Sequence, residues 1–448
     1  MVRDVTRRRF VKIGSAGTVI SLAGCTTTED PENAGGGGGG NGDDDTATDT
    51  DGGNGGGGNQ DPIPIGSLFP LTGFWSENGT AIRDAVQFTV DEINDAGGPL
   101  GRPLEHIDSD NEGADAQVAV QRMNQMVSQD GIVGHIGPTS GTLPAVKNIV
   151  EENEVVAISP AAGTHQLWRE GPPWWWRTVA DDFLETFAVV KAVQDLGAES
   201  AAIIGVENQA SKSINTQIEN IAADAGLDIT TTVLLPTGQS SASSTTSQAL
   251  STEPDKLILT CENGQVPSIL ETMLQNGYDS SDALITSEAR SPDTFNQVSD
   301  PQIIEGAWSM SASADTESEK YQNWAERFKS TTGVDNVHSF APPAFDATNV
   351  LALAIHAADS TAGADIADQM RPITNSPGKK VSTFEAGRDA LDNGEDINYD
   401  GITGPINFDE YGNVSGSFAV YQATESEWQV DHIIGPQAVR DFQDSIGS

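Results

Sequence analysis

From residue 63 onward, short apolar runs alternate with segments whose apolar residues recur at helical spacing. The segment 63–69 is the first such run, and it is typical of a strand. The next apolar positions recur at i, i+3, i+4, i+7, i+8 and i+11, the spacing of one buried helix face: Ile82, Ala85, Val86, Thr89, Val90 and Ile93. Gly97 and Gly98 then mark the end of this helix, because glycine commonly follows a helix C-terminus.

The same alternation continues through most of the chain. Further strands are predicted at 104–107, 132–136, 155–158, 201–206, 229–235, 257–260 and 283–286, and further helices at 116–127, 214–225 and 266–275. Strand–helix–strand units at this spacing predict mainly parallel sheets with helices on both faces. A chain of 448 residues exceeds the ~100–200 residues of one ordinary domain, so we expect two α/β lobes.

The charge of the chain excludes some classes of partner. The sequence has 66 acidic and 23 basic residues, a net charge of −43. Nucleic acids and anionic lipid surfaces select basic patches, so neither is expected to bind. Residues 61–448 alone hold 57 acidic and 18 basic residues, a net charge of −39. Because concentrated salt screens such self-repulsion, we interpret this as adaptation to brine, with an acidic secreted protein of lower salinity as the alternative.

The N-terminal 24 residues combine two export signals. Arg7, Arg8 and Arg9 precede an apolar residue and a lysine, a pattern that resembles the twin-arginine signal. A short apolar stretch follows and ends in Leu-Ala-Gly before Cys25, which is similar to a lipobox. We therefore predict a signal peptide at 1–24 and lipidation of Cys25. No run of 18 apolar residues exists, so we expect attachment to the membrane through the lipid only.

Residues 25–60 are predicted to form a tether between this anchor and the body. Residues 26–60 are rich in Gly and Asp and carry no aromatic or long aliphatic side chain, so they cannot form a core. A flexible coil of this length would reach about 30–35 Å. With Cys25 lipidated, Cys261 would have no disulfide partner, and its apolar surroundings predict a buried thiol.

Three loops that follow predicted strands carry the candidate binding groups. In open α/β sheets, ligands bind beyond the carboxyl ends of strands. The loops 137–141 and 159–164 offer hydroxyls and backbone N–H groups that suit an anion. The loop 286–290 places one carboxylate, Glu288, after a later strand. Glu288 could alternatively be an ordinary solvated acid, and the hydroxyls could serve as helix caps.

Six segments in order resemble the leucine-binding-type solute-binding proteins of ABC transporters. They are 66–73, 91–104, 158–162, 177–178, 345–347 and 404–409. The resemblance covers roughly 61–435 and implies the type I periplasmic-binding fold: two Rossmann-like α/β lobes with parallel sheets flanked by helices, joined by three hinge crossings. By this resemblance we expect an N-terminal lobe at 61–180 and 308–418 and a C-terminal lobe at 181–307 and 419–448.

The resemblance also implies a binding site. In amino-acid-binding members, hydroxyl residues after the third strand and in a Ser-Pro-Ala loop hold the ligand carboxylate. The matching positions here are Ser140 or Thr139, Ala161, and Thr164 or Gly163. Glu288 falls where the second lobe supplies an acid for the ligand ammonium. An aromatic is common where this chain has Asn78, and Trp75 lies close by.

Departures from the family leave the ligand open. The second lobe lacks the Tyr-Gly pair that often covers the ligand and reads Gln209-Ala210-Ser211 instead. The site is therefore expected to be more polar than a leucine site. We expect a monomeric, exported binding protein on the outer face of the cytoplasmic membrane, which delivers an amino acid or similar small polar solute to an ABC permease. The alternatives are an amide, urea or carboxylate ligand, and a membrane sensor as the partner.

Enzyme activity, cofactors and metals are not expected. The six histidines form no His-Glu-x-x-His pair or other zinc spacing. In the loop 137–141 the serine stands one place too late for a Gly-x-Ser-x-Gly nucleophile elbow. The sequence also contains no Gly-x-x-x-x-Gly-Lys phosphate loop. A binding protein is thus favoured over an enzyme.

Overall fold

The computed structural model describes most of the chain between residues 61 and 446. The described residues are 61–73, 75–164, 173–236, 238–239, 241–287, 289–290, 294–312, 314–316 and 318–446, with only the backbone at 209–210. They belong to one compact unit, Asn59–Ser448. The predicted signal peptide, Cys25, the tether and Glu288 lie outside the described residues.

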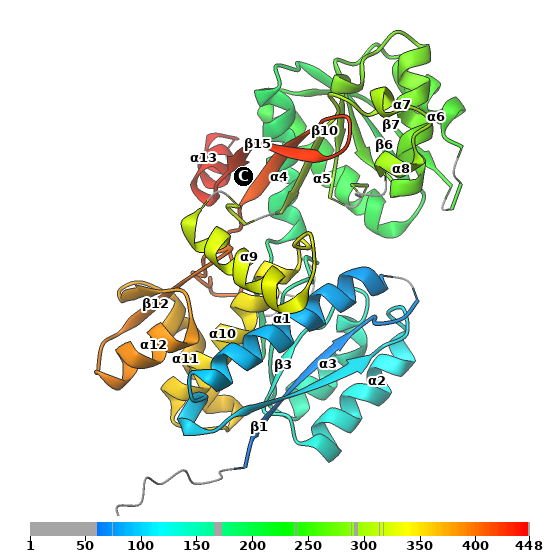
Figure 1. Ribbon diagram of the computed structural model, residues 1–448. Helices are drawn as coiled ribbons and strands as arrows, with labels where there is room; N and C mark the ends of the chain where they lie inside the picture. Colours follow the sequence, from blue (N-terminus) through cyan, green and yellow to red (C-terminus); the bar gives the residue numbers. More distant parts are fainter. Residues whose placement is uncertain are drawn as a thin grey trace, which may run out of the picture. The chain divides into compact units, whose positions relative to one another are not determined.

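The first sheet has five parallel strands in the order β2-β1-β3-β4-β5 (Figure 1). Its strands are β1 (Ile63–Phe69), β2 (Leu104–Asp110), β3 (Gly134–Ile136), β4 (Val156–Ser159) and β5 (Trp175–Arg177). The strands predicted at 63–69, 104–107, 132–136 and 155–158 are therefore confirmed, with ends that shift by at most three residues.

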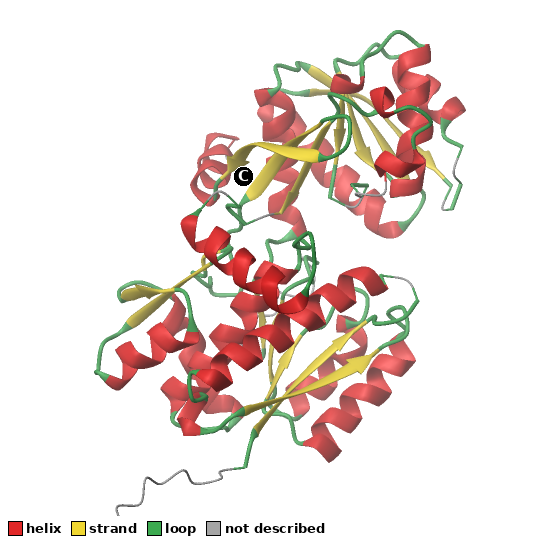
Figure 2. Cartoon of the chain, in the orientation of Figure 1, coloured by secondary structure: helices red, strands yellow, loops and turns green. Residues whose placement is uncertain are grey.

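Helices cover both faces of this sheet, as the alternation predicts (Figure 2). On one face lies α1 (Ser76–Asp95), and its predicted apolar positions are all buried. On the other face lie α2 (Ala116–Gln125) and α3 (Leu143–Glu152). Gly97 and Gly98 have φ angles of 103° and 69°, which side-chain-bearing residues rarely adopt, and this explains why glycines end α1.

The first lobe is completed by residues that come much later in the sequence. The added helices are α9 (Glu319–Thr332), α10 (Ala341–Ala358), α11 (Gly363–Thr374) and α12 (Phe384–Asp392). A small third sheet joins them, with β11 (Lys379–Val381), β12 (Ile397–Gly401) and β13 (Gly404–Pro405). One hydrophobic cluster contains side chains of β1, α1, α9, α10 and α11. The two halves of the lobe therefore share a core.

The side chain of Asp346 links this small sheet to α10 through hydrogen bonds. The Asp346 carboxylate is fully buried and accepts hydrogen bonds from the Tyr399 hydroxyl (3.0 Å), the Ile402 N–H (3.0 Å), and the Thr403 N–H and hydroxyl (2.9 and 2.5 Å). Burial raises the pKa of Asp346 to about 6, while these four hydrogen bonds oppose the rise. A buried acid at this position thus has a structural role.

The second sheet has seven strands in the order β15-β14-β10-β9-β8-β6-β7, and β14 runs antiparallel to both of its neighbours, β10 and β15. Its strands are β6 (Ser200–Val206), β7 (Asp228–Leu235), β8 (Lys256–Thr260), β9 (Ala283–Ile285), β10 (Trp308–Ala312), β14 (Phe418–Ala423) and β15 (Trp428–Ile434). One face is covered by α4 (Asp182–Asp195), α5 (Gln209–Ala225) and α13 (Pro436–Ile446). The other is covered by α6 (Ser243–Leu250) and α7 (Val266–Gln275), with the short α8 (Thr294–Gln297) nearby.

The chain crosses between the lobes three times: after β5, after β10 and after β13. The expected boundary at residue 308 is wrong by one strand, because β10 pairs with β9 and β14 and so belongs to the second sheet. The first and third crossings lie side by side, since Ala180 bridges to Val414 and the Arg177 N–H donates to the Gly412 carbonyl at 3.0 Å. The other limits of the predicted lobes stay predictions.

None of the helices in the described part of the chain has both the length and the apolar character needed to cross a membrane. The longest helices, α1 and α10, are accounted for by the packing of the first lobe.

Candidate functional site

Two loops at the carboxyl ends of the neighbouring strands β3 and β4 are tied together by one buried hydroxyl. The Ser159 hydroxyl donates a hydrogen bond to the Pro138 carbonyl at 2.6 Å. It also accepts from the N–H groups of Ala161 (3.1 Å) and Ala162 (2.8 Å). Ser159 has no exposed surface, so these bonds form away from water. The two predicted binding loops therefore form one structural unit.

The second link between these loops joins two predicted site residues. The Thr164 N–H donates to the Ser140 hydroxyl at 3.4 Å, and both residues are half-buried. Thr139 has a different environment, because its hydroxyl lies 3.1 Å from the Thr142 hydroxyl and the residue is only 7% exposed. Its carbonyl accepts from the N–H of Leu143 at the start of α3. The geometry thus favours Ser140 over Thr139 as the accessible hydroxyl.

Several donors remain available at this position. The N–H groups of Ser140 and Gly141 donate no hydrogen bond to any other described residue. The N–H of Ala161 is already used by Ser159, which limits what Ala161 can offer a ligand. Hydroxyls and free backbone N–H groups at the end of a parallel strand suit the oxygens of a small anion. The arrangement can therefore hold a carboxylate.

The side chain of a buried arginine supports the loop that follows β4. Arg177, at the end of β5, has no exposed surface, and one of its amino groups donates to the carbonyls of Ala162 (3.2 Å) and Thr164 (3.1 Å). Its other amino group pairs with the Asp181 carboxylate. Burial lowers the pKa of Arg177, and the neighbouring Asp181 charge counteracts this effect. The ion pair thus fixes the backbone of the loop that carries Thr164.

Trp75 and Asn78 lie at the start of α1, beyond the carboxyl end of β1. Trp75 precedes the helix with a left-handed φ of 69°, and its ring centroid is 5.2 Å from that of Phe340. Asn78 is half-buried in the first turn of α1. Because β1 lies beside β3 in the sheet, this loop shares an edge with Ser140. Among the described residues, no hydrogen bond joins Trp75 or Asn78 to Ser140 or Thr164.

In the second lobe, the residues next to Glu288 are anchored. The Thr286 hydroxyl donates to the Leu259 carbonyl at 3.0 Å. The Ser287 hydroxyl donates to the carboxylate of Glu185 at 2.5 Å, and the Ser287 N–H approaches the same oxygen at 3.4 Å. Glu185 was not predicted as a site residue, because it lies 102 positions earlier in the sequence. Its only sequence signal is its position in the first turn of the helix after the first crossing.

Arg290 is a second residue that the sequence analysis missed. One of its amino groups donates to the Ser311 hydroxyl at 3.1 Å, and its guanidinium lies 4.4 Å from the centre of the Tyr421 ring. These contacts hold the cation against β10 and β14. The end of the loop 286–290 is therefore attached to the second sheet through a cation–π contact and a hydrogen bond.

Ser211, in the segment where the resemblance leads us to look for a Tyr-Gly pair, belongs to a buried polar network. The Ser211 hydroxyl accepts from the Val206 N–H (3.0 Å) and donates to the Thr260 carbonyl (3.3 Å). The Thr260 hydroxyl in turn donates to Asn215 at 2.6 Å. These residues join the ends of β6 and β8, so their polar groups are used internally.

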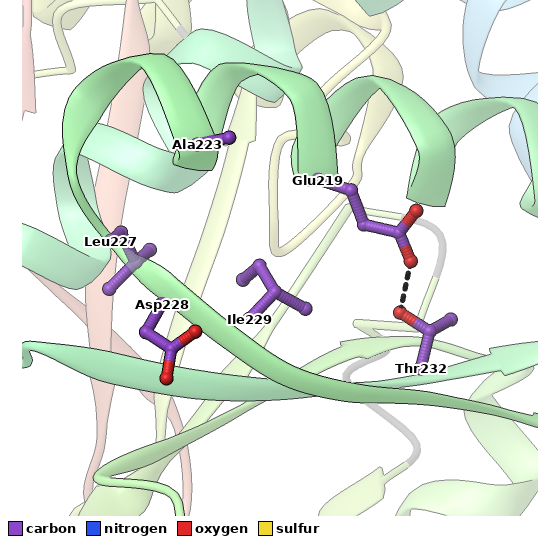
Figure 3. A pocket seen from close by; sticks show the side chains of 6 residues that line it. All are labelled: Glu219, Ala223, Leu227, Asp228, Ile229 and Thr232. Carbon is purple, nitrogen blue, oxygen red and sulfur yellow. Dashed lines mark hydrogen bonds between the residues drawn. The ribbon is translucent and has the colours of Figure 1, made fainter.

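Two hollows in the surface lie away from these loops. One of about 430 Å³ is lined by residues of α1, α9, α10 and α12, including Glu92 and Arg327. The other, of about 350 Å³, lies between α5 and β7, where Glu219 accepts a 2.5 Å hydrogen bond from Thr232 (Figure 3). Neither contains a predicted site residue. The described residues also include no group of three or more His, Cys, Asp or Glu side chains placed to hold a metal ion.

Two proteins of known sequence that resemble this chain are described as binding proteins. A chemotactic signal transduction system substrate-binding protein of Halobacterium salinarum is 23% identical over 361 residues, which cover 77% of this chain and 83% of the relative. A leucine-, isoleucine-, valine-, threonine-, and alanine-binding protein of Pseudomonas aeruginosa is 28% identical over 173 residues, which cover 38% of this chain and 45% of the relative.

Solved structures share the fold. The leucine binding protein LivK of Thermotoga maritima has a TM-score of 0.67 at 20% identity, over 84% of this chain and 99% of its own. The branched-chain amino acid transporter substrate binding protein LivJ of Streptococcus pneumoniae, in complex with isoleucine, has a TM-score of 0.67 at 18% identity, over 83% and 98%. The family model described as periplasmic binding protein matches residues 62–427. With two α/β lobes, three crossings and a family match over most of its length, the chain belongs to the periplasmic binding protein family, a family of solute-binding proteins.

Proposed function

We propose that this protein captures an amino acid or a similar small polar solute outside the cytoplasm and delivers it to an ABC permease. The single observation that carries the proposal is the joined pair of loops after β3 and β4, with Ser140 and Thr164 in contact. Their hydroxyls and N–H groups would hold the ligand carboxylate. Glu288, next to the anchored Ser287, would then bind the ligand ammonium.

The class of ligand follows from the charges that surround the site. The first-lobe loops offer donors, whereas the second-lobe loop carries the carboxylate of Glu288. A ligand with a carboxylate at one end and an ammonium at the other complements both sets. Leucine or isoleucine is bound by relatives whose descriptions name these ligands. The sequence has no tyrosine at 209–211 to cover a ligand, which supports a small polar amino acid rather than leucine here, with amides, urea or carboxylates as the alternative class.

Ligand identity can be tested directly. Mass spectrometry of solutes co-purified from concentrated salt should find a small zwitterion, and thermal unfolding should then rank amino acids, urea, amides and carboxylates. A ligand present at 100 times its Kd stabilises the folded state by about 2.7 kcal/mol, which such a scan resolves. Ser140→Ala and Thr164→Val should each weaken binding about tenfold, the loss of one hydrogen bond.

Matched controls keep this test specific. Ser128→Ala removes a hydroxyl that donates, within the described part of the chain, to the Asn124 carbonyl alone at the end of α2, so it should leave the affinity unchanged. Glu288→Gln should weaken binding of an ammonium-bearing ligand while sparing a carboxylate without one. Equal affinity of wild type and Glu288→Gln for an amino acid would reject the assigned role of Glu288.

Export and anchoring are also proposed, from the twin-arginine pattern and Cys25. The chain would be attached to the outer face of the cytoplasmic membrane by lipid on Cys25, with residues 26–60 as a tether. Membrane fractionation tests this proposal, because Cys25→Ser should move the protein into the soluble fraction. Retention of the variant in the membrane fraction would show that another attachment exists.

A membrane sensor is the second candidate partner. The chemotactic substrate-binding relative of Halobacterium salinarum supports it, since that relative aligns over 77% of this chain. Crosslinking of the anchored, ligand-loaded protein in its own membranes, followed by identification of the captured partner, separates the two. Permease subunits would support transport, whereas a receptor would support sensing.

A further inference from the structure

The first turn of α4 contacts loops from both halves of the proposed site. This helix begins directly after the first crossing, and it packs against the second sheet through Phe187, Val190 and other buried side chains. Its N-terminal residues Asp181, Asp182 and Glu185 each hold a different partner. One turn of helix thus lies where the two proposed binding loops are attached.

On the first-lobe side, the attachment is a buried ion pair and a close backbone contact. Arg177 holds the carbonyls of the loop 162–164 and pairs with Asp181, the residue that caps α4 by accepting from the Phe183 N–H at 2.6 Å. The Asp182 N–H donates to the Gly163 carbonyl at 2.9 Å. A Cβ atom at Gly163 would lie 1.7 Å from the Asp182 carboxylate. The loop 162–164 therefore packs closely against the start of α4.

On the second-lobe side, the attachment is the Glu185 carboxylate. It lies four residues after Asp181, one helical turn away. Its oxygen receives both the hydroxyl and the N–H of Ser287, directly before Glu288. A continuous series of contacts therefore runs from Thr164 through Arg177, Asp181 and Glu185 to the second-lobe loop.

We infer that Arg177 and Glu185 are positioning residues that couple the two binding loops through the first turn of α4. The inference rests on the proposed function, in which these loops bind the solute from opposite ends. A helical turn is stiff. The ion pair between Arg177 and Asp181 also resists separation, because separation would leave a buried charge unpaired. Movement of the loop 162–164 on binding therefore shifts the start of α4 and, with it, Ser287. Binding of the solute to the first-lobe loop would therefore change the position of Ser287 before the solute reaches the second-lobe loop.

Hydrogen exchange of the ligand-free, full-length protein in concentrated salt tests the coupling. Glu185→Ala should speed exchange locally around Ser287. It should also speed exchange at the protected N–H groups of Ala161, Ala162 and Thr164 in the other loop, by about threefold or more, since local opening reports on the contacts that close each segment. Conversely, Arg177→Met should speed exchange at Ser287, and Arg177→Lys should restore part of the wild-type rate.

Glu219→Ala is the matched control. Glu219 also lies on a helix of the second lobe and accepts a 2.5 Å hydrogen bond from a hydroxyl, that of Thr232 (Figure 3). No hydrogen bond joins it to the described residues of either loop. It should leave exchange at 161–164 and 286–290 unchanged. If Glu185→Ala altered exchange only around Ser287, the coupling would be refuted, and this holds even if Arg177→Met fails to fold.

A second arm separates this inference from the proposed function. L-threonine, a small polar amino acid named in the description of one relative, serves as the probe, with affinity measured by calorimetry for wild type and Glu185→Ala. Weaker binding by the variant, with remote exchange effects, supports both proposals. Remote exchange effects without any binding of amino acids by wild type would leave the coupling established and reject the proposed ligand class. Equal affinity together with purely local exchange would overturn the coupling alone.

Discussion

His135 lies in the middle of β3, two residues before the loop that carries Ser140, and its side chain has no exposed surface. No group in the described part of the chain makes a hydrogen bond of standard geometry with either ring nitrogen. Burial lowers the pKa of His135 to about 3, and the nearby backbone of Gly66 opposes this only in part. The imidazole is therefore neutral in the folded protein between pH 5 and pH 7.

The unfolded chain binds this proton far more readily, because a solvated histidine has a pKa of about 6.5. As the pH falls below 6.5, protonation stabilises the unfolded state while the folded state stays neutral. The stability that depends on His135 is thus fully present above about pH 6.5 and is lost toward pH 3, at about 1.36 kcal/mol for each pH unit. At pH 5 the loss amounts to about 2 kcal/mol.

Replacing the imidazole with an apolar side chain should remove this loss. We expect the difference in free energy of unfolding between wild type and His135→Leu to change by about 2 kcal/mol between pH 7 and pH 5. Urea unfolding in concentrated salt at pH 7, 6 and 5 measures it. Burial also lowers the pKa of His106 and His338 to about 4. Both histidines are present in wild type and in the variant, so their contributions to the free energy of unfolding cancel in the difference. His432→Leu, at an exposed position, is the control. Parallel pH profiles for wild type and His135→Leu would refute the reasoning.

Three further predictions follow from buried contacts and from charge. Asp346→Asn should lower the free energy of unfolding by about 3 kcal/mol, because an amide cannot accept all four hydrogen bonds that the carboxylate receives; an unchanged urea midpoint would contradict this. Gly163→Ala should lower the melting temperature and weaken solute binding, since its Cβ collides with Asp182, and a variant with both values unchanged would show that the loop relaxes freely. Dilute buffer should unfold the protein, which circular dichroism across a salt titration measures, because residues 61–448 carry a net charge of −39; full structure in 50 mM salt would contradict the brine interpretation.

The fold could be predicted from the sequence because the apolar residues of its helices and strands recur with clear periodicities. The apolar face of α1 and the bounds of α7 (266–275) were predicted correctly, since each buries one stripe against a sheet. The boundary at residue 308 failed for a physical reason: β10 is a five-residue strand, and strand patterns do not reveal which sheet a strand joins. That information lies in pairing with β9 and β14.

Only part of the candidate site could be predicted from the sequence. The loops after β3 and β4 could be selected, because ligands of α/β sheets bind at carboxyl ends. The choice between Ser140 and Thr139 required the structure, which shows the Thr139 hydroxyl bonded to Thr142 at the start of α3. The contact between Glu185 and Ser287 joins residues 102 positions apart, and no local pattern in the sequence indicates it.

The first lobe is discontinuous in the chain, and this affects the order in which it can form during synthesis. The strands of its sheet end at Arg177, whereas α10, which fills the core they share, ends at Ala358. At ordinary translation rates of about 5–20 residues per second, the sheet waits on the order of ten to thirty seconds for its missing helices. Meanwhile the apolar side chains of β1 and α1 that pack against α10 lack that partner, although the second lobe can begin to fold. The twin-arginine route, which the pattern at Arg7–Arg9 resembles, is a route for proteins already folded, and export by it would give the first lobe time to close before it leaves the cytoplasm.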